Sequence, residues 1–210
     1  MSKDGNENRP HLRMVVNNTE KRSQRPSTDK DDFISFQELA ANLDLFRTRF
    51  YQELTPLKAQ AFREIENFLC EKRWPYGLDP DHGQVLVIPA AVVCSVCDEH
   101  GGAGEDELLV YLAEDTTGEG ICLALEMLMP YYSEDEAVME EAFLFSPVNQ
   151  YGTLFLEENR QDSFLDLIYR LAFPLYPVNP DKALLGRFFS IAGNELKWTL
   201  QGLAEYSDNF

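Results

Sequence analysis

Two cysteines and a histidine form the densest group of metal ligands in the sequence, Cys94-Ser-Val-Cys97-Asp-Glu-His100. Zinc prefers thiolate and imidazole ligands, and CxxC is a common half of a structural zinc site. A complete site needs a fourth donor, and the remaining candidates stand alone in the sequence: Cys70, His82 and Cys122. We therefore expect buried thiols in a sheet. A metal-binding regulatory site through Cys94, Cys97 and His100 is the alternative, and it requires a turn at Ser95-Val96.

The CxxC pair could also carry redox chemistry, as in thioredoxin-like proteins. In those proteins the pair stands at a helix N-terminus after a strand, where the helix dipole lowers the thiol pKa. Here the pattern places the pair inside or at the end of a strand, beside Asp98 and Glu99, whose charges would raise the thiol pKa. A redox role is therefore not expected.

Other patterns that could support chemistry are incomplete. Asp79-Pro-Asp81-His-Gly83 resembles the start of a calcium loop, but it lacks the third oxygen ligand and has Ala90 where a bidentate Glu would stand, so it predicts a turn. No Gly-x-Ser-x-Gly nucleophile motif accompanies the three histidines. Carboxylate pairs of the glycosidase kind stay open, because their separation is three-dimensional. The sequence thus predicts no catalytic, cofactor-binding or metal-binding residues and no enzyme.

The charge is distributed unevenly along the chain. Residues 74–159 contain 18 Asp and Glu and no Lys or Arg, so this acidic block holds the whole formal charge of −18. Lys and Glu solvate a folded surface equally well, so a one-sided choice indicates selection on the electrostatic field and on the partners it attracts. Such a field repels phosphate backbones and anionic lipid. We expect a basic protein partner, with no direct nucleic-acid binding by the folded domain and no membrane.

Length and composition indicate a globular protein. The chain has 210 residues, of which 44% are hydrophobic and 12% aromatic, enough for one domain with a full core. No apolar run approaches the length of a membrane span, and the polar start has no secretory signal pattern, so we expect the cytoplasm and reduced cysteines. Residues 1–32 have almost no bulky apolar side chains, which predicts a disordered polar tail before a single domain at 33–210.

Capping residues predict where the helices begin. Ser35 with Glu38 is a capping box ahead of a helix over residues 35–54, and Thr55 with Pro56 begins a second helix that ends near Trp74. Two further helix starts are predicted, by Ser133 with Glu136 for a short helix and by Asn179 with Pro180 for a last helix.

Alternating or β-branched apolar residues predict the strands. The predicted segments are 85–93, 108–113, 121–129, which Pro130 should end, and 153–156. Residues 164–173 alternate as a strand would, yet Asp166 and Arg170 also have the i,i+4 spacing of a helix, so both structures remain open.

The predicted fold is α+β, an antiparallel sheet packed by helices in the order α-α-β-β-β-α-β-β-α. This order resembles that of class I type III secretion chaperones and of the YbjN-like family. Three segments are similar to theirs: residues 62–72 before an Asp-containing turn, Asn149-Gln-Tyr-Gly152 before Thr153-Leu-Phe-Leu-Glu157, and a final helix with Trp198. The resemblance implies a small acidic protein that binds another polypeptide, often as a homodimer, without catalysis.

Charge and element order together favour a chaperone-like or adaptor-like protein-binding module. Its acidic surface would hold a basic or partly unfolded segment of another protein. The alternatives are the metal-binding regulatory domain described above and an inhibitor that mimics the charge of DNA.

Overall fold

The computed structural model describes residues 13–14, 35–97, 106–114, 120–133, 136–145, 149–158, 165–175 and 179–208. Their strands form one antiparallel sheet in the order β2-β3-β4-β5-β7-β6, with the two-residue strand β1 paired to β5. The strands are β1 Arg13–Met14, β2 Gly77–Asp79, β3 Val85–Pro89, β4 Glu107–Glu114, β5 Ile121–Ser133, β6 Thr153–Glu158 and β7 Leu165–Pro174.

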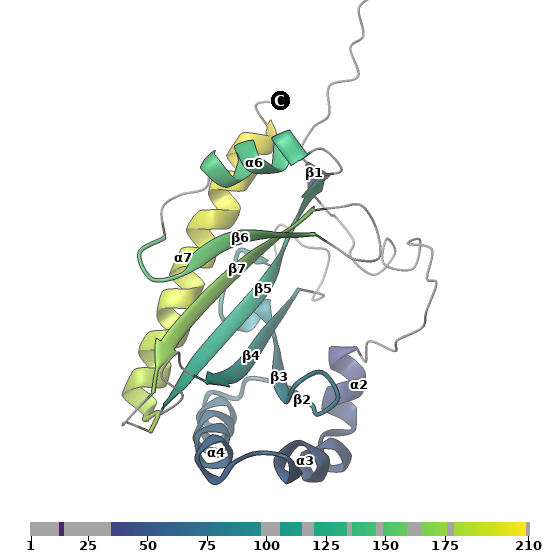
Figure 1. Ribbon diagram of the computed structural model, residues 1–210, viewed down its shortest axis with the longest axis vertical. Helices are drawn as coiled ribbons and strands as arrows, with labels where there is room; N and C mark the ends of the chain where they lie inside the picture. The colour runs from purple at the N-terminus through teal and green to yellow at the C-terminus, as the bar shows by residue number, and fades with distance from the viewer. Residues whose placement is uncertain are drawn as a thin grey trace, which may run out of the picture.

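The helices confirm the α+β class. They are α2 Phe36–Ala41, α3 Leu43–Gln52, α4 Pro56–Lys72, α6 Glu136–Phe145 and α7 Lys182–Asp208. The long helix α7 runs behind the sheet with α4 beside it, whereas α2 and α3 pack against β2 at the lower end (Figure 1). The short helix α6 lies at the upper end, where it contacts α7, β5, β6 and β7. No helix among the described residues is long and apolar enough to cross a bilayer.

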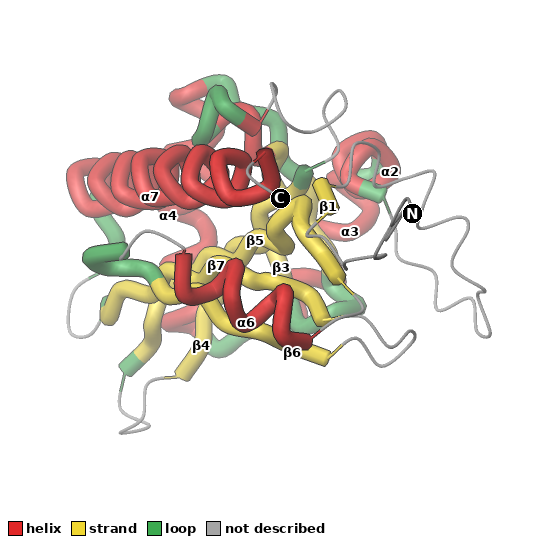
Figure 2. The backbone as a smooth tube through the Cα atoms, turned by 90° about the horizontal axis from the view of Figure 1, so that it is seen from above, coloured by secondary structure: helices red, strands yellow, loops and turns green. Residues whose placement is uncertain are grey.

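The core lies between α7, α4 and one face of the sheet. Alternate residues of each central strand point into it, and the buried face of α7 repeats every three to four residues. Figure 2 shows α7 and α4 on one side of the strands, and no described helix covers the middle of the opposite face. The core residues from β4, β5, β7 and α7 include Leu108, Val110, Leu123, Leu125, Met127, Leu167, Tyr169, Leu171, Leu185, Phe188, Ala192, Leu196 and Leu200.

Two predicted helix starts are confirmed by their caps. The Ser35 hydroxyl accepts a hydrogen bond from the Glu38 N–H at 3.3 Å, and the Thr55 hydroxyl accepts one from the Lys58 N–H at 3.4 Å. The prediction of one helix over 35–54 was wrong, because the chain breaks at Asn42. There the Asn42 side chain donates to the Glu38 carbonyl at 3.0 Å, which ends α2 before α3 begins.

The first strands differ from the prediction. The strand expected over 85–93 ends at Pro89, because a 3-10 turn at Ala90–Val92 follows it. The short strand β2, which the sequence analysis missed, pairs with β3. The strand expected to stop at Pro130 continues to Ser133, because a register shift between Leu128 and Tyr132 accommodates a residue that has no N–H for the ladder.

The remaining segments resolve the open alternatives. Residues 165–174 form a strand, and Arg170 pairs across the sheet with Glu126 instead of along a helix with Asp166. The last helix begins at Lys182 and not at Pro180, because the Asp181 carboxylate accepts the Leu184 N–H at 2.7 Å and acts as the N-cap. Within the predicted tail, Arg13–Met14 pairs with β5 as β1, and the other residues of 1–32 lie outside the described part.

Candidate functional site

A groove of about 410 Å³ lies between α6 and β6. Glu140, Phe143 and Leu144 form its α6 wall. The β6 wall consists of three consecutive residues, Leu154, Phe155 and Leu156. Because successive side chains of a strand point to opposite faces, lining by three consecutive residues indicates that this α6–β6 groove follows the outer edge of β6.

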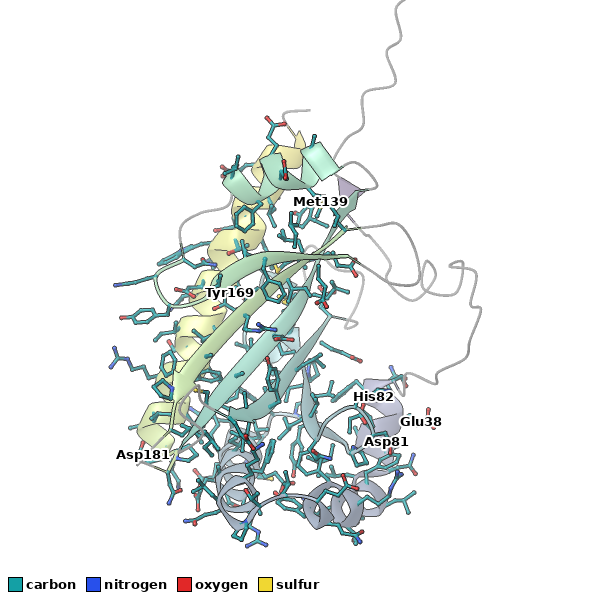
Figure 3. The ribbon with its side chains drawn as sticks, in the orientation of Figure 1. Glu38, Asp81, His82, Met139, Tyr169 and Asp181 are labelled. Atoms are coloured by element: carbon teal, nitrogen blue, oxygen red, sulfur yellow. The ribbon has the colours of Figure 1, made fainter. Side chains whose placement is uncertain are left out.

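The groove exposes apolar surface. Phe143 is 40% exposed and Leu144 is 78% exposed, although Met139 one turn earlier is fully buried beneath α6 (Figure 3). A helix that buries one residue against the body and leaves larger apolar side chains in solvent has unused contact area. Exposed apolar side chains gathered along a groove are typical of an interaction site.

The edge of the sheet and the charges beside it add to this surface. β6 is the terminal strand and pairs with β7, and among the described residues no strand pairs with its other edge. Its outward N–H and C=O groups can therefore pair with another chain. Glu140, Glu141 and Glu157 are exposed along α6 and β6, and the acidic block contributes no Lys or Arg to this region.

A polar ladder crosses the uncovered sheet face beside the groove. The hydroxyl of Tyr111 and the guanidinium of Arg170 both donate to Glu126, and Arg170 also lies 4.5 Å from the centroid of the Phe155 ring. Burial, followed by the hydrogen bond to Glu126, raises the pKa of Tyr111 to about 12. The Glu126 charge is thus neutralised within the ladder, and the acidic character of the groove comes from α6 and β6.

The CxxC pair lies in a turn and not in the predicted strand. The Cys97 N–H donates to the Cys94 carbonyl at 3.1 Å, and the two side chains are only 3% and 4% exposed. α7 packs closely against this turn, because a Cβ at Gly193 would collide with the Val93 carbonyl. In a regular strand, residues three apart point to opposite faces, so the two thiols could not lie on one side. That restriction does not hold in a turn.

The turn changes the chemistry of Cys94. A hydrogen bond from the Cys97 thiol lowers the pKa of Cys94 to about 6, and the backbone N–H groups of Val96 and Cys97 and the charge of Lys197 act in the same direction against burial. The expectation of a raised thiol pKa was therefore wrong. Lys197 lies one helical turn after Gly193 on α7, far away in the sequence, and Asp98 and Glu99 lie outside the described residues.

The described residues do not form a complete metal site around Cys94 and Cys97. His100 lies outside them, and no group of three or more His, Cys, Asp or Glu side chains within them could hold a metal ion. Cys70 is exposed on α4, and Cys122 is half-buried on β5. The segment with Asp79 forms the predicted turn, where its carboxylate accepts the N–H groups of Asp81 and His82 at 2.9 and 3.2 Å.

One buried carboxylate, Glu195 of α7, was not among the residues singled out from the sequence. It is 3% exposed, and its oxygens accept the N–H groups of Gln150, Tyr151 and Gly152 and the hydroxyl of Tyr169, each at 2.8 Å. A signal for it was present, because Glu195 interrupts the apolar stripe of the last helix between Ala192 and Leu196. Its bonds fix the loop that leads into β6, so Glu195 positions the edge strand.

Comparisons with known proteins give a structural likeness. No protein-family model matches the sequence, and no curated protein matches it. The chain is similar to the crystal structure of YbjN from E. coli, with a TM-score of 0.43 and 12% sequence identity over 67% of this chain and 89% of that chain. A likeness at this level does not identify a family or a function.

Proposed function

We propose that this chain is a non-enzymatic, chaperone-like or adaptor-like protein-binding module that holds a basic or partly unfolded segment of another protein. The α6–β6 groove is the docking site. The observation that carries the proposal is the combination of exposed Phe143 and Leu144 with the outer edge of β6 along the same groove, which pairs with no strand among the described residues.

The surface specifies the chemistry of the partner segment. An extended peptide can add a strand to β6 through main-chain hydrogen bonds, while alternate side chains enter the apolar groove. The six residues of β6 provide an edge of about 20 Å, which fits a segment of similar length. Lys or Arg residues beside that segment would meet Glu140, Glu141 and Glu157, so we expect binding to weaken as salt rises.

The test combines partner capture with matched variants. The full chain is used at low salt to capture proteins from lysate of its own cell, and the binding segment of a stoichiometric partner is then made as a peptide and titrated. Leu144→Glu should weaken the peptide by about tenfold or more, because it places a charge in the apolar groove. Leu45→Glu is the control, since Leu45 is 66% exposed on α3 at the other end of the molecule.

The possible outcomes separate the hypotheses. A partner with a basic segment whose binding is weakened by Leu144→Glu and by salt, but not by Leu45→Glu, supports the proposal. Empty captures at low salt, or equal effects of the two substitutions, contradict it. Competition between DNA and this chain for the captured protein would instead indicate DNA mimicry.

A further inference from the structure

A second hollow is lined by α3 and α4. Figure 1 shows these two helices at the opposite end of the molecule from α6. The volume of the hollow is about 710 Å³, within the range of small-molecule sites. The lining residues of each helix recur at helical spacing, so each helix contributes one face to the hollow. The lining residues are Arg47, Thr48, Tyr51 and Gln52 from α3, Arg63, Glu66, Asn67 and Cys70 from α4, and Tyr76.

The floor of this α3–α4 hollow is a saturated hydrogen-bond network around Glu66. Glu66 is 7% exposed and accepts bonds from the Arg47 guanidinium at 2.7 Å, from the Tyr76 hydroxyl at 2.8 Å and from the Tyr51 hydroxyl. Burial and the hydrogen bonds to Glu66 raise the pKa of both tyrosines, so both are neutral donors. Three donors of the protein itself are therefore bound to the carboxylate of Glu66.

Positive charge remains after this pairing. Arg63 is exposed, its guanidinium lies 5.6 Å from the centroid of the Tyr51 ring, and within the described residues it forms no ion pair with a carboxylate. The buried Nε of Arg47 has no hydrogen-bond partner among the described residues. Arg47 also lies 3.8 Å from the carboxylate of Asp44, which is fully exposed, does not line the hollow and is screened by water. Among the lining side chains, two guanidinium groups stand against one carboxylate, so the lining has a net charge of about +1 in a protein of net charge −18.

We propose that the α3–α4 hollow is a binding site for a small organic anion, whose carboxylate or phosphate group is bound by Arg63. The guanidinium of Arg47 donates to Glu66 and to the Tyr76 hydroxyl, so it contributes positive charge beside the ligand. The planar guanidinium fork suits both head groups. Tyr51 and Tyr76 contact the apolar body of the ligand, and Asn67, Gln52 and Thr48 offer further hydrogen bonds. A polyanion is excluded by charge, because a long phosphate chain would extend into the field of the acidic block.

The first experiment titrates the full chain with benzoate and with phenyl phosphate, and follows the binding by calorimetry and by the NMR signal of the Arg63 side chain. Benzyl alcohol tests the aromatic body without a charge. Arg63→Gln should weaken the better anion by about tenfold, the usual effect of losing a charged hydrogen bond. Lys72→Gln is the matched control, because Lys72 lies on the same helix, 5.7 Å from the Phe68 ring, and does not line the hollow.

Cys70 supplies an independent readout that does not depend on the choice of ligand. It is exposed at the wall of the hollow, whereas Cys94 and Cys97 are buried. In a Cys122→Ser background, the Cys70 thiolate would attack the anionic aromatic disulfide dithiobis-nitrobenzoate. The S–S bond of the reagent breaks, one half forms a mixed disulfide with Cys70, and the other half leaves as one thionitrobenzoate anion. The rate of this reaction is divided by the rate of Cys70 with the neutral disulfide dithiodipyridine. The ratio should fall about tenfold in Arg63→Gln, because the local cation attracts the anionic reagent.

Each outcome decides the proposal. Saturable binding of either anion, weakened by Arg63→Gln but not by Lys72→Gln, together with the fall in relative thiol rate, supports an anion site. The absence of any change at Arg63 with both anions at about 10 mM overturns it, as do equal effects of the two substitutions. Binding of benzyl alcohol as tight as that of benzoate also overturns it, since the charge would then have no role.

Discussion

The hydroxyl of Tyr169 on β7 donates a 2.8 Å hydrogen bond to the buried carboxylate of Glu195 on α7 (Figure 3 labels Tyr169). The same carboxylate receives three consecutive backbone N–H groups from the loop before β6. One side chain therefore joins the helix, the central sheet and the edge strand that lines the α6–β6 groove.

Gly152 should not tolerate a larger residue, because a Cβ there would lie 2.5 Å from the Tyr169 ring and 2.7 Å from Oε2 of Glu195. We expect Gly152→Ala to lower the free energy of unfolding by about 1 to 3 kcal/mol, measured by urea denaturation. Gly186→Ala is the control, because nothing lies within 4 Å of a Cβ at that helical position. It should be neutral or stabilise by about 1 kcal/mol. Equal losses in both variants would contradict the close packing at Gly152.

Removing the Glu195 carboxylate should leave three N–H groups and the Tyr169 hydroxyl without their acceptor. Glu195→Ala should therefore cost about 3 kcal/mol or more of unfolding free energy. Gln201→Ala, an exposed change on the same helix, should cost less than about 0.5 kcal/mol. Hydrogen exchange of the amides at 150–152 provides a local test, and their continued protection in Glu195→Ala would refute the assignment.

The stability of the folded chain should depend on Cys94 between pH 6 and pH 9. The Cys97 hydrogen bond lowers the folded-state pKa of Cys94 from 9.0 to about 6, so within this range the unfolded chain binds a proton that the folded chain does not. The stabilisation is complete above the unfolded pKa and is lost as pH falls toward the folded pKa. Under reducing conditions, the stability difference between wild type and Cys94→Ser should thus grow as pH rises. The part of the thiolate absorbance that wild type has and Cys94→Ser lacks should titrate near pH 6, and a midpoint near 9 for this difference would refute the lowered pKa.

The N-cap of the last helix distinguishes the structure from the sequence pattern. Asp181→Ala should reduce the unfolding free energy by about 1 kcal/mol, because the Leu184 N–H loses its acceptor. Asn179→Ala should have an effect within about 0.5 kcal/mol, since Asn179 is exposed and stands outside the helix. A larger loss in Asn179→Ala than in Asp181→Ala would instead support the sequence-based N-cap at Asn179. Thermal unfolding of the two variants at the same pH measures both effects.

Local signals in the sequence predicted most of the fold. Capping residues such as Ser35 and Thr55 act within one helical turn, so their patterns located α2 and α4 correctly. Alternation in residues 164–173 left strand and helix open, because the pairing of Arg170 with Glu126 joins segments 44 residues apart. The same limit explains the error at Pro130, where the partner strand decides whether a bulge can form.

The candidate sites were less predictable than the fold. The acidic block was visible in the sequence, but the α6–β6 groove arises only where β6 comes to lie at the edge of the sheet. The lowered pKa of Cys94 depends partly on Lys197, a residue of another element. The α3–α4 hollow brings together Arg47, Glu66 and Tyr76 only when α3, α4 and the start of β2 have packed. Their spacing in the sequence therefore did not predict the hollow.

The strand order also has a consequence for synthesis on the ribosome. β5 pairs with β7 and not with β6, which follows it first in the chain. During translation, one edge of β5, the longest strand, therefore stays unpaired until residues 165–174 have emerged. β6 can pair with β7 only after that. The late arrival of this pairing predicts a slow, non-local folding step and a nascent chain that exposes one edge of β5 until β7 has been synthesised.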